Sequence, residues 1–262
     1  MCLLVLAWQA HPRYRLIVAA NRDEFHERPT APLSRWPAPD NILAGRDLRA
    51  NGTWLGLDQR RHFGVITNFR ELQRPRPDAP SRGGLIPRFL REKTGAQSFL
   101  TQLESQAAEY SGFNLLLTDR DSLWYASNRA PGFARALSPG VYGLSNEFLD
   151  TPWPKLRRVR KEFERWLSDP ANGSPEGLFA LLDDRTRANT DEELPQTGLE
   201  AEWERVLSAP FVLHPDYGTR CSTVLLLEPS GTAYLAERRF SPDGRQTGET
   251  VFELPAGDWP PS

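Results

Sequence analysis

The sequence predicts an α+β protein whose sheets are mostly antiparallel. Short apolar runs come in pairs joined by connections of a few residues, whereas parallel strands need crossovers of a dozen residues or more. Helical patterns arrive in consecutive pairs instead of alternating with strands, which argues against a doubly wound fold. The sequence also lacks both glycine-rich nucleotide-binding motifs, G-x-G-x-x-G and G-x-x-x-x-G-K-[ST].

The bulk properties are those of an ordinary globular chain. It has 262 residues, 39% of them hydrophobic and 25% charged, with a formal net charge of −2. This length buries a core without disulfides, and no long flexible linker divides it, so we expect a single domain over residues 1–262. The balanced charge excludes the strongly basic class typical of nucleic-acid-binding proteins. Oligomeric state is left open by these observations.

The cysteines and the apolar runs together indicate the cellular location that we expect for the protein. Cys2 and Cys221 are the only two cysteines, which excludes a disulfide framework and any CxxC motif. No basic segment precedes the first apolar run, so we expect no secretory signal. No run of about 18 apolar residues occurs, so we expect no membrane span. We therefore expect a cytoplasmic protein with two free thiols.

The first part of the chain reads as hairpins. Residues 2–9 and 14–20 are apolar strands joined across the sequence AHPR, and residues 53–57 and 62–68 form a second pair. The proline-rich stretch 28–41 between the two pairs is expected to have no regular structure.

The rest of the chain alternates pairs of helices with strands. Thr151 and Pro152 are expected to begin one helix, and Ser174 and Pro175 the next. A polar acidic stretch at 191–200 is predicted to be a loop or lid. The predicted helices span 85–93, 96–109, 150–167 and a segment from 175, and the predicted strands span 114–118, 122–126, 141–144, 222–227, 232–237 and 250–254.

The first hairpin brings a polar box back to the start of the chain. The second strand ends in Asn21, Arg22, Asp23 and Glu24. If the loop is centred between residues 11 and 12, Cys2 lies opposite Asn21, and a shift of one or two residues would place Arg22 or Asp23 there instead. Directly opposed residues have Cβ atoms about 4.5–5.5 Å apart, so Cys2 is expected within reach of the box. Arg22 and Asp23 are expected to face Cys2.

This juxtaposition suggests nucleophilic chemistry. A thiolate is the reactive form of cysteine, and the positive charge of Arg22 would lower the pKa of the Cys2 thiol. If Met1 is removed, Cys2 also carries the α-amine, which titrates near 7.7–8.0 and can act as a general base, with Asp23 accepting its hydrogen bond. The alternative interpretation is that Cys2 is a small buried apolar residue and the box a solvated turn.

Several motifs together resemble a known family. MCLLV, AANRDEF, GTWLG, TNFR, RGGL, YGLSN and YGTRCSTV occur in order along nearly the whole chain. They resemble the NRDE family, which is the transport and Golgi organisation protein 2 family. That family is in turn similar to N-terminal nucleophile (Ntn) hydrolases of the choloylglycine hydrolase and penicillin V acylase group. The resemblance implies a four-layer αββα sandwich.

The resemblance also implies roles for individual residues. Cys2 corresponds to the nucleophile, and Asp23 to the carboxylate that holds the amine. Asn68 and Asn146 correspond to the two asparagines of such sites, expected to stabilise an oxyanion. The residues expected to line a ligand site are Asn21, Arg22, Trp54 and Arg220, and the residues expected to be catalytic are Cys2, Arg22, Asp23, Asn68, Asn146 and Arg220.

Other candidate sites are weaker. None of the four histidines has metal-ligand spacing with another histidine or a cysteine, so no metal site is predicted. A Cys–His dyad with His26 remains an option, as does a Cys2–Cys221 pair. The basic residues at 155, 157, 158, 160, 161 and 165 share one predicted helix and are best explained as its solvated face.

Two functions are therefore predicted from different classes. The first is a hydrolase of a small amide that uses Cys2 as its nucleophile and requires no cofactor. The second is a binding and trafficking protein, in which Arg22 and Arg220 would pair with the carboxylates of an apolar anion such as haem. In both cases the partner is a small molecule.

Overall fold

The computed structural model describes residues 2–71, 78–169 and 173–260. The chain forms two compact units that interleave along the sequence. The first unit comprises Met1–Glu27, Pro139–Ser145 and Leu149–Pro255, and the second comprises Arg28–Ser138, Asn146–Phe148 and Ala256–Ser262. The expectation of one domain over residues 1–262 stays a prediction.

The first unit is built on a six-stranded sheet in the order β10-β1-β2-β11-β12-β13, and every described strand pair in it is antiparallel. Its strands are β1 (Cys2–Trp8), β2 (Leu16–Phe25), β10 (Gly140–Leu144), β11 (Tyr217–Leu227), β12 (Ala233–Phe240) and β13 (Gln246–Leu254). Its helices are α3 (Pro154–Ser168), α4 (Pro175–Leu182) and α5 (Ala201–Val206), with a 3₁₀ turn at Asp191–Glu193.

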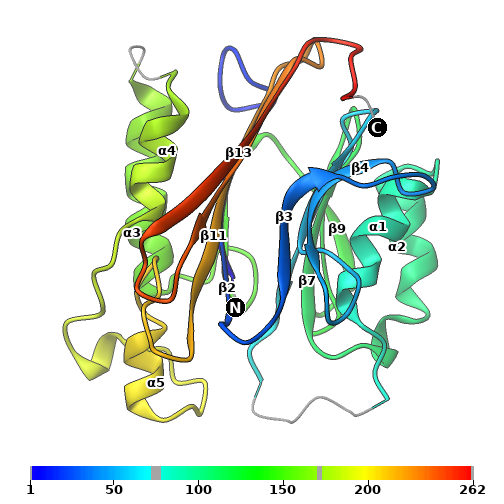
Figure 1. Ribbon diagram of the computed structural model, residues 1–262. Helices are drawn as coiled ribbons and strands as arrows, with labels where there is room; N and C mark the ends of the chain where they lie inside the picture. The colour runs from blue at the N-terminus through cyan, green and yellow to red at the C-terminus, as the bar shows by residue number, and fades with distance from the viewer. Residues whose placement is uncertain (1, 72–77, 170–172, 261–262) are drawn as a thin grey trace. The chain divides into compact units, whose positions relative to one another are not determined.

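Helices α3 and α4 cover one face of this sheet (Figure 1). The apolar stripe of α3 packs against alternate residues of β1, β2 and β11, which is the pattern that the pleat of a strand imposes. The helix has a defined direction over the sheet. Leu156 in its first turn lies against Gly143 of β10, whereas Trp166 near its end stacks on His11 in the β1–β2 loop. The start of α3 therefore lies at the end of the sheet where β1 begins.

The second unit is a seven-stranded antiparallel sheet in the sequential order β3 to β9. Its strands are β3 (Thr30–Arg35), β4 (Ile42–Asp47), β5 (Leu55–Asp58), β6 (Phe63–Asn68), β7 (Phe113–Thr118), β8 (Leu123–Ser127) and β9 (Ala134–Leu137). Its helices are α1 (Leu85–Arg91) and α2 (Ala96–Glu104), with 3₁₀ turns at Arg82–Gly84 and Ala107–Glu109.

Helices α1 and α2 bury their apolar residues against one face of this second sheet (Figure 1). Phe89 and Phe99 meet edge to face, with ring centroids 5.3 Å apart. Each unit thus supplies one sheet with a pair of helices packed on one face, which are the components of the predicted fold. The prediction of an α+β protein with antiparallel sheets is confirmed.

Three strands lie where the sequence predicted none. The expectation that residues 28–41 have no regular structure was wrong, because β3 occupies Thr30–Arg35. β3 is an edge strand, and an edge tolerates Pro32 because a missing N–H there breaks no ladder hydrogen bond. The other two, β4 and β9, are short.

The helix starts were predicted with mixed success. Helix α4 begins as expected, since the Ser174 hydroxyl accepts a hydrogen bond from the Glu176 N–H at 3.2 Å. Helix α3 begins at Pro154 after Trp153, two residues later than the predicted Pro152.

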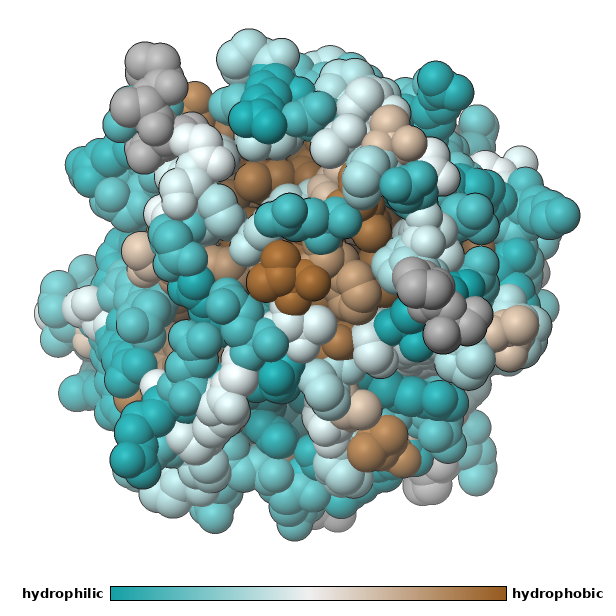
Figure 2. Space-filling view, turned by 45° about the horizontal axis from the view of Figure 1, so that its top comes forward, coloured by the Kyte–Doolittle hydropathy of each residue, from teal (hydrophilic) through white to brown (hydrophobic). Residues whose placement is uncertain are grey.

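The surface is mixed in character. Figure 2 shows a face that is mostly hydrophilic, with apolar side chains gathered near its middle. No helix among the described residues is both long and apolar enough to cross a bilayer.

Candidate functional site

Cys2 lies directly opposite Arg22 in the β1–β2 ladder. The predicted partner was Asn21, which instead pairs with Leu3. The shift of one residue arises in the loop, since Trp8 pairs with Leu16 and the hairpin is therefore centred on residue 12. Because paired residues share a face of the sheet, the side chains of Cys2 and Arg22 point to the same side.

Arg22 also pairs with the second cysteine. On its other flank it lies opposite Cys221 of β11, so Arg22 occupies the strand position between the two cysteines, on the same face of the sheet. Two strand spacings separate the Cα atoms of Cys2 and Cys221, about 10 Å, and a disulfide spans less than about 7 Å. A bond between the two thiols is therefore ruled out in this fold, and both cysteines are free.

Burial decides the protonation of both thiols. Burial raises the pKa of the Cys2 thiol, and the positive charge of Arg22 opposes this without overcoming it. Arg22 therefore acts on the pKa of Cys2 in the expected direction, but burial outweighs it and the net shift is upward. Burial and the nearby Glu237 carboxylate raise the pKa of Cys221 well above its usual value. Neither thiol ionises on its own near neutral pH.

Asp23 faces the opposite side of the sheet from Cys2. It follows Arg22 by one residue, and its partner across the β2–β11 ladder is Thr219, whose hydroxyl donates to the Asp23 carboxylate at 2.7 Å. A bulge between Thr219 and Cys221 makes this possible, because the extra residue turns Thr219 toward the helix-covered face. The expectation that Asp23 shares the face of Cys2 was therefore wrong.

The Asp23 carboxylate sits in a strongly polar but dry environment. It is 1% exposed, and burial raises its pKa. Four influences favour the charged form: the positive charges of Lys155, of the amino terminus and of Arg22, and the hydrogen bond from Thr219. The Tyr217 hydroxyl donates to the Asp23 carbonyl oxygen at 2.9 Å and fixes the backbone.

The Asn21 side chain makes hydrogen bonds to three segments of the first unit. Its Nδ2 donates to the carbonyl oxygens of Leu182 at 2.8 Å and Pro210 at 3.0 Å, and its Oδ1 accepts from the Ser222 hydroxyl at 2.6 Å. These bonds tie together the two ends of the long connection between α4 and β11. The side-chain amide of Asn21 is thus engaged within the fold, and its predicted ligand-binding role stays a prediction.

Arg220 occupies the bulge of β11 and lies near Arg22. Its guanidinium donates to the carbonyl oxygen of Phe25 at 2.9 Å and to that of His26 at 3.3 Å. Burial, followed by the charge of Arg22, lowers the pKa of Arg220. Two guanidiniums thus lie within electrostatic range of each other at the end of β2.

Sequence reasoning missed two hydroxyl contacts and one lysine. The Ser145 hydroxyl donates to the Cys2 carbonyl oxygen at 3.0 Å, and Thr219 binds Asp23. Each directly precedes a residue that was predicted, Asn146 and Arg220. Lys155 was assigned to a solvated helix face, but it is only 1% exposed. Its spacing from Val159 and Phe163 places it on the apolar stripe, a signal already present in the sequence.

Asn68, Asn146 and Trp54 belong to the second unit. The buried Asn146 donates its Nδ2 to the Asn68 carbonyl oxygen at 2.8 Å, so the two asparagines are held together. Trp54 packs half-buried against the core under α1 and α2. Their roles in oxyanion stabilisation and ligand binding stay predictions.

The histidines do not join the site. The His26 ring bonds the His214 carbonyl at 3.1 Å, and His26 lies four residues beyond Arg22, about 13 Å along an extended chain, so a dyad with Cys2 is not formed. Within residues 2–71, 78–169 and 173–260, no three His, Cys, Asp or Glu side chains cluster in a way that could hold a metal ion.

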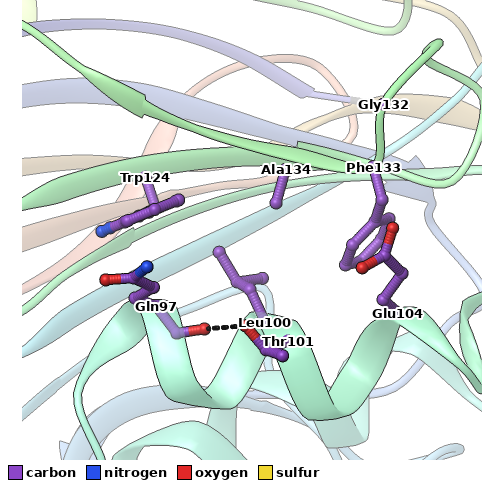
Figure 3. A pocket seen from close by; sticks show the side chains of 8 residues that line it. All are labelled: Gln97, Leu100, Thr101, Glu104, Trp124, Gly132, Phe133 and Ala134. Carbon is purple, nitrogen blue, oxygen red and sulfur yellow. Dashed lines mark hydrogen bonds between the residues drawn. The ribbon is translucent and has the colours of Figure 1, made fainter.

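A small cavity of about 190 Å³ lies in the second unit between α2 and the strands β8 and β9 (Figure 3). Gln97, Leu100, Thr101 and Glu104 line it from the helix. It includes none of the predicted site residues, and it is smaller than the roughly 300 Å³ at which ligand pockets begin.

Two solved structures share this fold. One is a Caenorhabditis elegans N-acylethanolamine-hydrolyzing acid amidase ortholog, with a TM-score of 0.50 at 11% identity, covering 87% of this chain and 93% of its own. The other is the C2A mutant of conjugated bile acid hydrolase from Clostridium perfringens, with a TM-score of 0.51 at 8% identity, covering 97% and 92%. The predicted Ntn-hydrolase-like fold is thus confirmed.

Curated relatives match by sequence. The transport and Golgi organization protein 2 homolog of Bos taurus is 34% identical over 261 residues, which is 91% of this chain and 92% of that protein. The Homo sapiens homolog is 32% identical, with the same coverage, and the Drosophila melanogaster protein is 28% identical over 99% of this chain and 95% of its own. The family profile for Transport and Golgi organisation 2 matches residues 1–242. The chain belongs to the Transport and Golgi organisation 2 family.

Proposed function

We propose that the protein is an N-terminal-nucleophile-type hydrolase of a small amide, with Cys2 as the nucleophile. The observation that carries the proposal is the end of β2, which presents Arg22 directly opposite Cys2 and the buried Asp23 one residue further on. The shared fold supports it, because the two solved structures are described as an amide-hydrolysing enzyme and a bile acid hydrolase.

The protonation of Cys2 defines what the site needs. Because burial keeps the thiol neutral, a base must take its proton as the sulfur attacks the amide carbonyl. If nothing precedes Cys2 in the active protein, its own α-amine is that base. Asp23 is the carboxylate available to accept a hydrogen bond from the amine, and the Ser145 hydroxyl fixes the Cys2 backbone through its carbonyl.

The reaction then takes two steps. Sulfur adds to the amide carbonyl, the C–N bond breaks, and the proton taken from the thiol passes to the departing amine, which leaves a thioester on Cys2. Water, deprotonated by the α-amine, attacks the thioester and releases a carboxylic acid and the thiol. Asn68 and Asn146 are the predicted oxyanion donors. This chemistry requires no cofactor. It does require a reducing compartment that keeps both thiols free, which fits a cytoplasmic location.

The test is acylation of Cys2 by a thiol-directed acyl probe. Intact-mass and amino-terminal analysis first establish whether Met1 is removed. We expect Cys2→Ala to abolish labelling and Cys221→Ala, the matched control, to retain it, because Cys221 is buried beside Glu237. Equal labelling of the Cys2→Ala variant, or retention of Met1 in the native protein, would refute the amine-assisted mechanism.

A second candidate function rests on the pair of guanidiniums. Arg22 and Arg220 lie within electrostatic range of each other, and such pairs bind carboxylates well. The ligand in that case is an apolar anion such as haem, carried without turnover. Titration with haem at micromolar concentration is expected to shift the Soret band, and Arg220→Ala is expected to weaken the binding. No shift in the wild-type protein would exclude haem as the ligand.

A further inference from the structure

The first turn of α3 carries a buried lysine that the proposed reaction does not use. Lys155 is 1% exposed, among the largest fully buried side chains of the molecule. An ammonium group is costly to remove from water unless it interacts with an opposite charge. The other basic residues of this helix behave differently, since Arg158 pairs with Asp184 and Arg160 with Asp150 at the surface.

The direction of α3 carries Lys155 to the end of the sheet where Cys2 lies. Leu156, the next residue, packs on Gly143 of β10, and two residues further along that chain the Ser145 hydroxyl bonds Cys2. Helical side chains lean toward the helix amino terminus, so Lys155 extends further toward this end. It does so on the face of the sheet that α3 covers, which is also the face of Asp23.

We infer that Lys155 is a positioning residue of the Cys2 site: its buried ammonium keeps Asp23 charged, and so able to hold the α-amine of Cys2. This inference rests on the proposed function for the meaning of the amine. It deepens that proposal by naming Lys155 as the group that lets the buried Asp23 carboxylate stay ionised. Of the charges that act on Asp23, that of Lys155 opposes burial most strongly.

The consequence for catalysis has a definite sign. Asp23 and the α-amine form a coupled pair that is active when the amine is neutral and the carboxylate is charged. A neighbouring positive charge lowers the affinity of the whole pair for protons. Removing the charge of Lys155 must therefore move proton uptake by the pair to higher pH, whichever member takes the proton. The other groups that act on Asp23, namely the amino terminus, Thr219, Arg22 and Tyr217, are unchanged by that substitution.

The direct test follows the Asp23 carboxyl itself. With the side-chain carboxyl carbon of aspartate labelled with ¹³C, the Asp23 signal is assigned by its loss in Asp23→Asn and titrated by NMR. We expect Lys155→Met to move this titration to higher pH and Lys155→Arg to keep it near wild type. Lys161→Met, the same change at an exposed position of the same helix, should leave it unmoved. An unmoved Asp23 signal in Lys155→Met would overturn the inference.

A second measurement covers the case in which Lys155→Met folds poorly. The double variant Asp23→Asn/Lys155→Met removes both charges, so it should be less destabilised than the sum of the two single variants. Strictly additive losses in the denaturation midpoint would overturn the inference.

The outcomes separate this inference from the proposed function. The NMR titration and the double-mutant cycle need neither a substrate nor removal of Met1. If Cys2 takes no acyl group but the Asp23 titration moves, the hydrolase proposal fails and the Lys155–Asp23 coupling stands. If Cys2 is acylated, the acid limb of the acylation rate should move to higher pH in Lys155→Met, and an unchanged profile would contradict the positioning role.

Discussion

At the scale of single residues, β2 divides its final polar side chains between the two faces of one sheet. Arg22 shares a face with both cysteines, whereas Asn21 and Asp23 point to the face that α3 and α4 cover. One face therefore holds the thiol and the guanidinium, and the other holds the scaffold bonds and the carboxylate. Cys2 presents its side chain to the first face, whereas the backbone nitrogen of a strand residue lies near the plane of the sheet, between the two faces.

His11 provides a residue-scale prediction about pH. Its Nδ1 accepts hydrogen bonds from the backbone N–H groups of Arg13 and Tyr14, and burial, with the charge of Arg13, lowers the pKa of His11. A lowered pKa in the folded state means that the neutral ring contributes stability above the unfolded value of about 6.5, and that this contribution is lost as pH falls through the folded pKa. We expect the free energy of unfolding to fall on acidification below about pH 6.5 for this reason.

The matched variant is His11→Asn, which keeps an acceptor for the turn but does not titrate in this range. Urea denaturation at several pH values should show a flatter pH dependence for His11→Asn than for wild type. Identical slopes in the two proteins would show that the His11 turn does not contribute to the acid sensitivity.

At the scale of elements, two glycine segments of the second unit touch backbone to backbone. A Cβ atom on Gly52 would lie 2.4 Å from the carbonyl carbon of Gly83, and the Thr53 N–H donates to the Gly83 carbonyl oxygen at 3.0 Å. Neither backbone can yield without breaking this bond. We expect Gly52→Ala to destabilise the protein by about 1–3 kcal/mol, the usual range for overpacking.

Gly84 is the control, since a Cβ there meets nothing within 4 Å. Gly84→Ala should change the free energy of unfolding by no more than about 0.5 kcal/mol. Urea denaturation of the two variants measures the difference, and equal stabilities would show that the close approach of Gly52 to Gly83 is not maintained in solution.

Elements with a clear period could be predicted from the sequence, and those without one could not. The first hairpin and its polar box follow from apolar runs and the pleat, which placed Cys2 within one residue of its true partner, Arg22. The one-residue error in the predicted register arose from the loop, whose backbone turns at Gln9 with a φ of 48°. The side of the sheet to which Thr219 points, and hence its bond to Asp23, depends on a bulge at Arg220. No sequence pattern predicts this bulge.

At the scale of the whole molecule, the chain passes repeatedly from one unit to the other. Short segments such as Pro139–Ser145 and Asn146–Phe148 belong to different units although they are adjacent in sequence. Neither unit is therefore a continuous piece of chain, and cutting the sequence at any single point would remove part of a sheet or its support from one of them. Unit boundaries of this kind are not marked by linker sequences.

The carboxy-terminal tail is held by contacts within the second unit. After β13 in the first unit, Ala256–Ser262 belongs to the second. There the Asp258 carbonyl oxygen accepts from Arg61 at 2.8 Å, the Arg61 guanidinium lies 5.7 Å from the centre of the Trp259 ring, and the Trp259 Nε1–H donates to Asn41 at 3.1 Å. These contacts join the tail to the β3–β4 and β5–β6 turns, and they bury most of Arg61, which is 5% exposed.

Trp259→Ala should therefore loosen both turns. We expect a loss of roughly 1–2 kcal/mol in unfolding free energy, below the 3–5 kcal/mol typical of a fully buried tryptophan, because Trp259 is only half-buried. Leu48→Ala is the control, since Leu48 is an exposed apolar residue of the same unit. Amide hydrogen exchange is the sharper measurement, because the Arg61 N–H, which bonds the Asp58 carbonyl at 3.0 Å, should exchange faster in Trp259→Ala alone. If the Arg61 N–H exchanges equally slowly in Trp259→Ala and in wild type, the tail does not stabilise the β5–β6 turn.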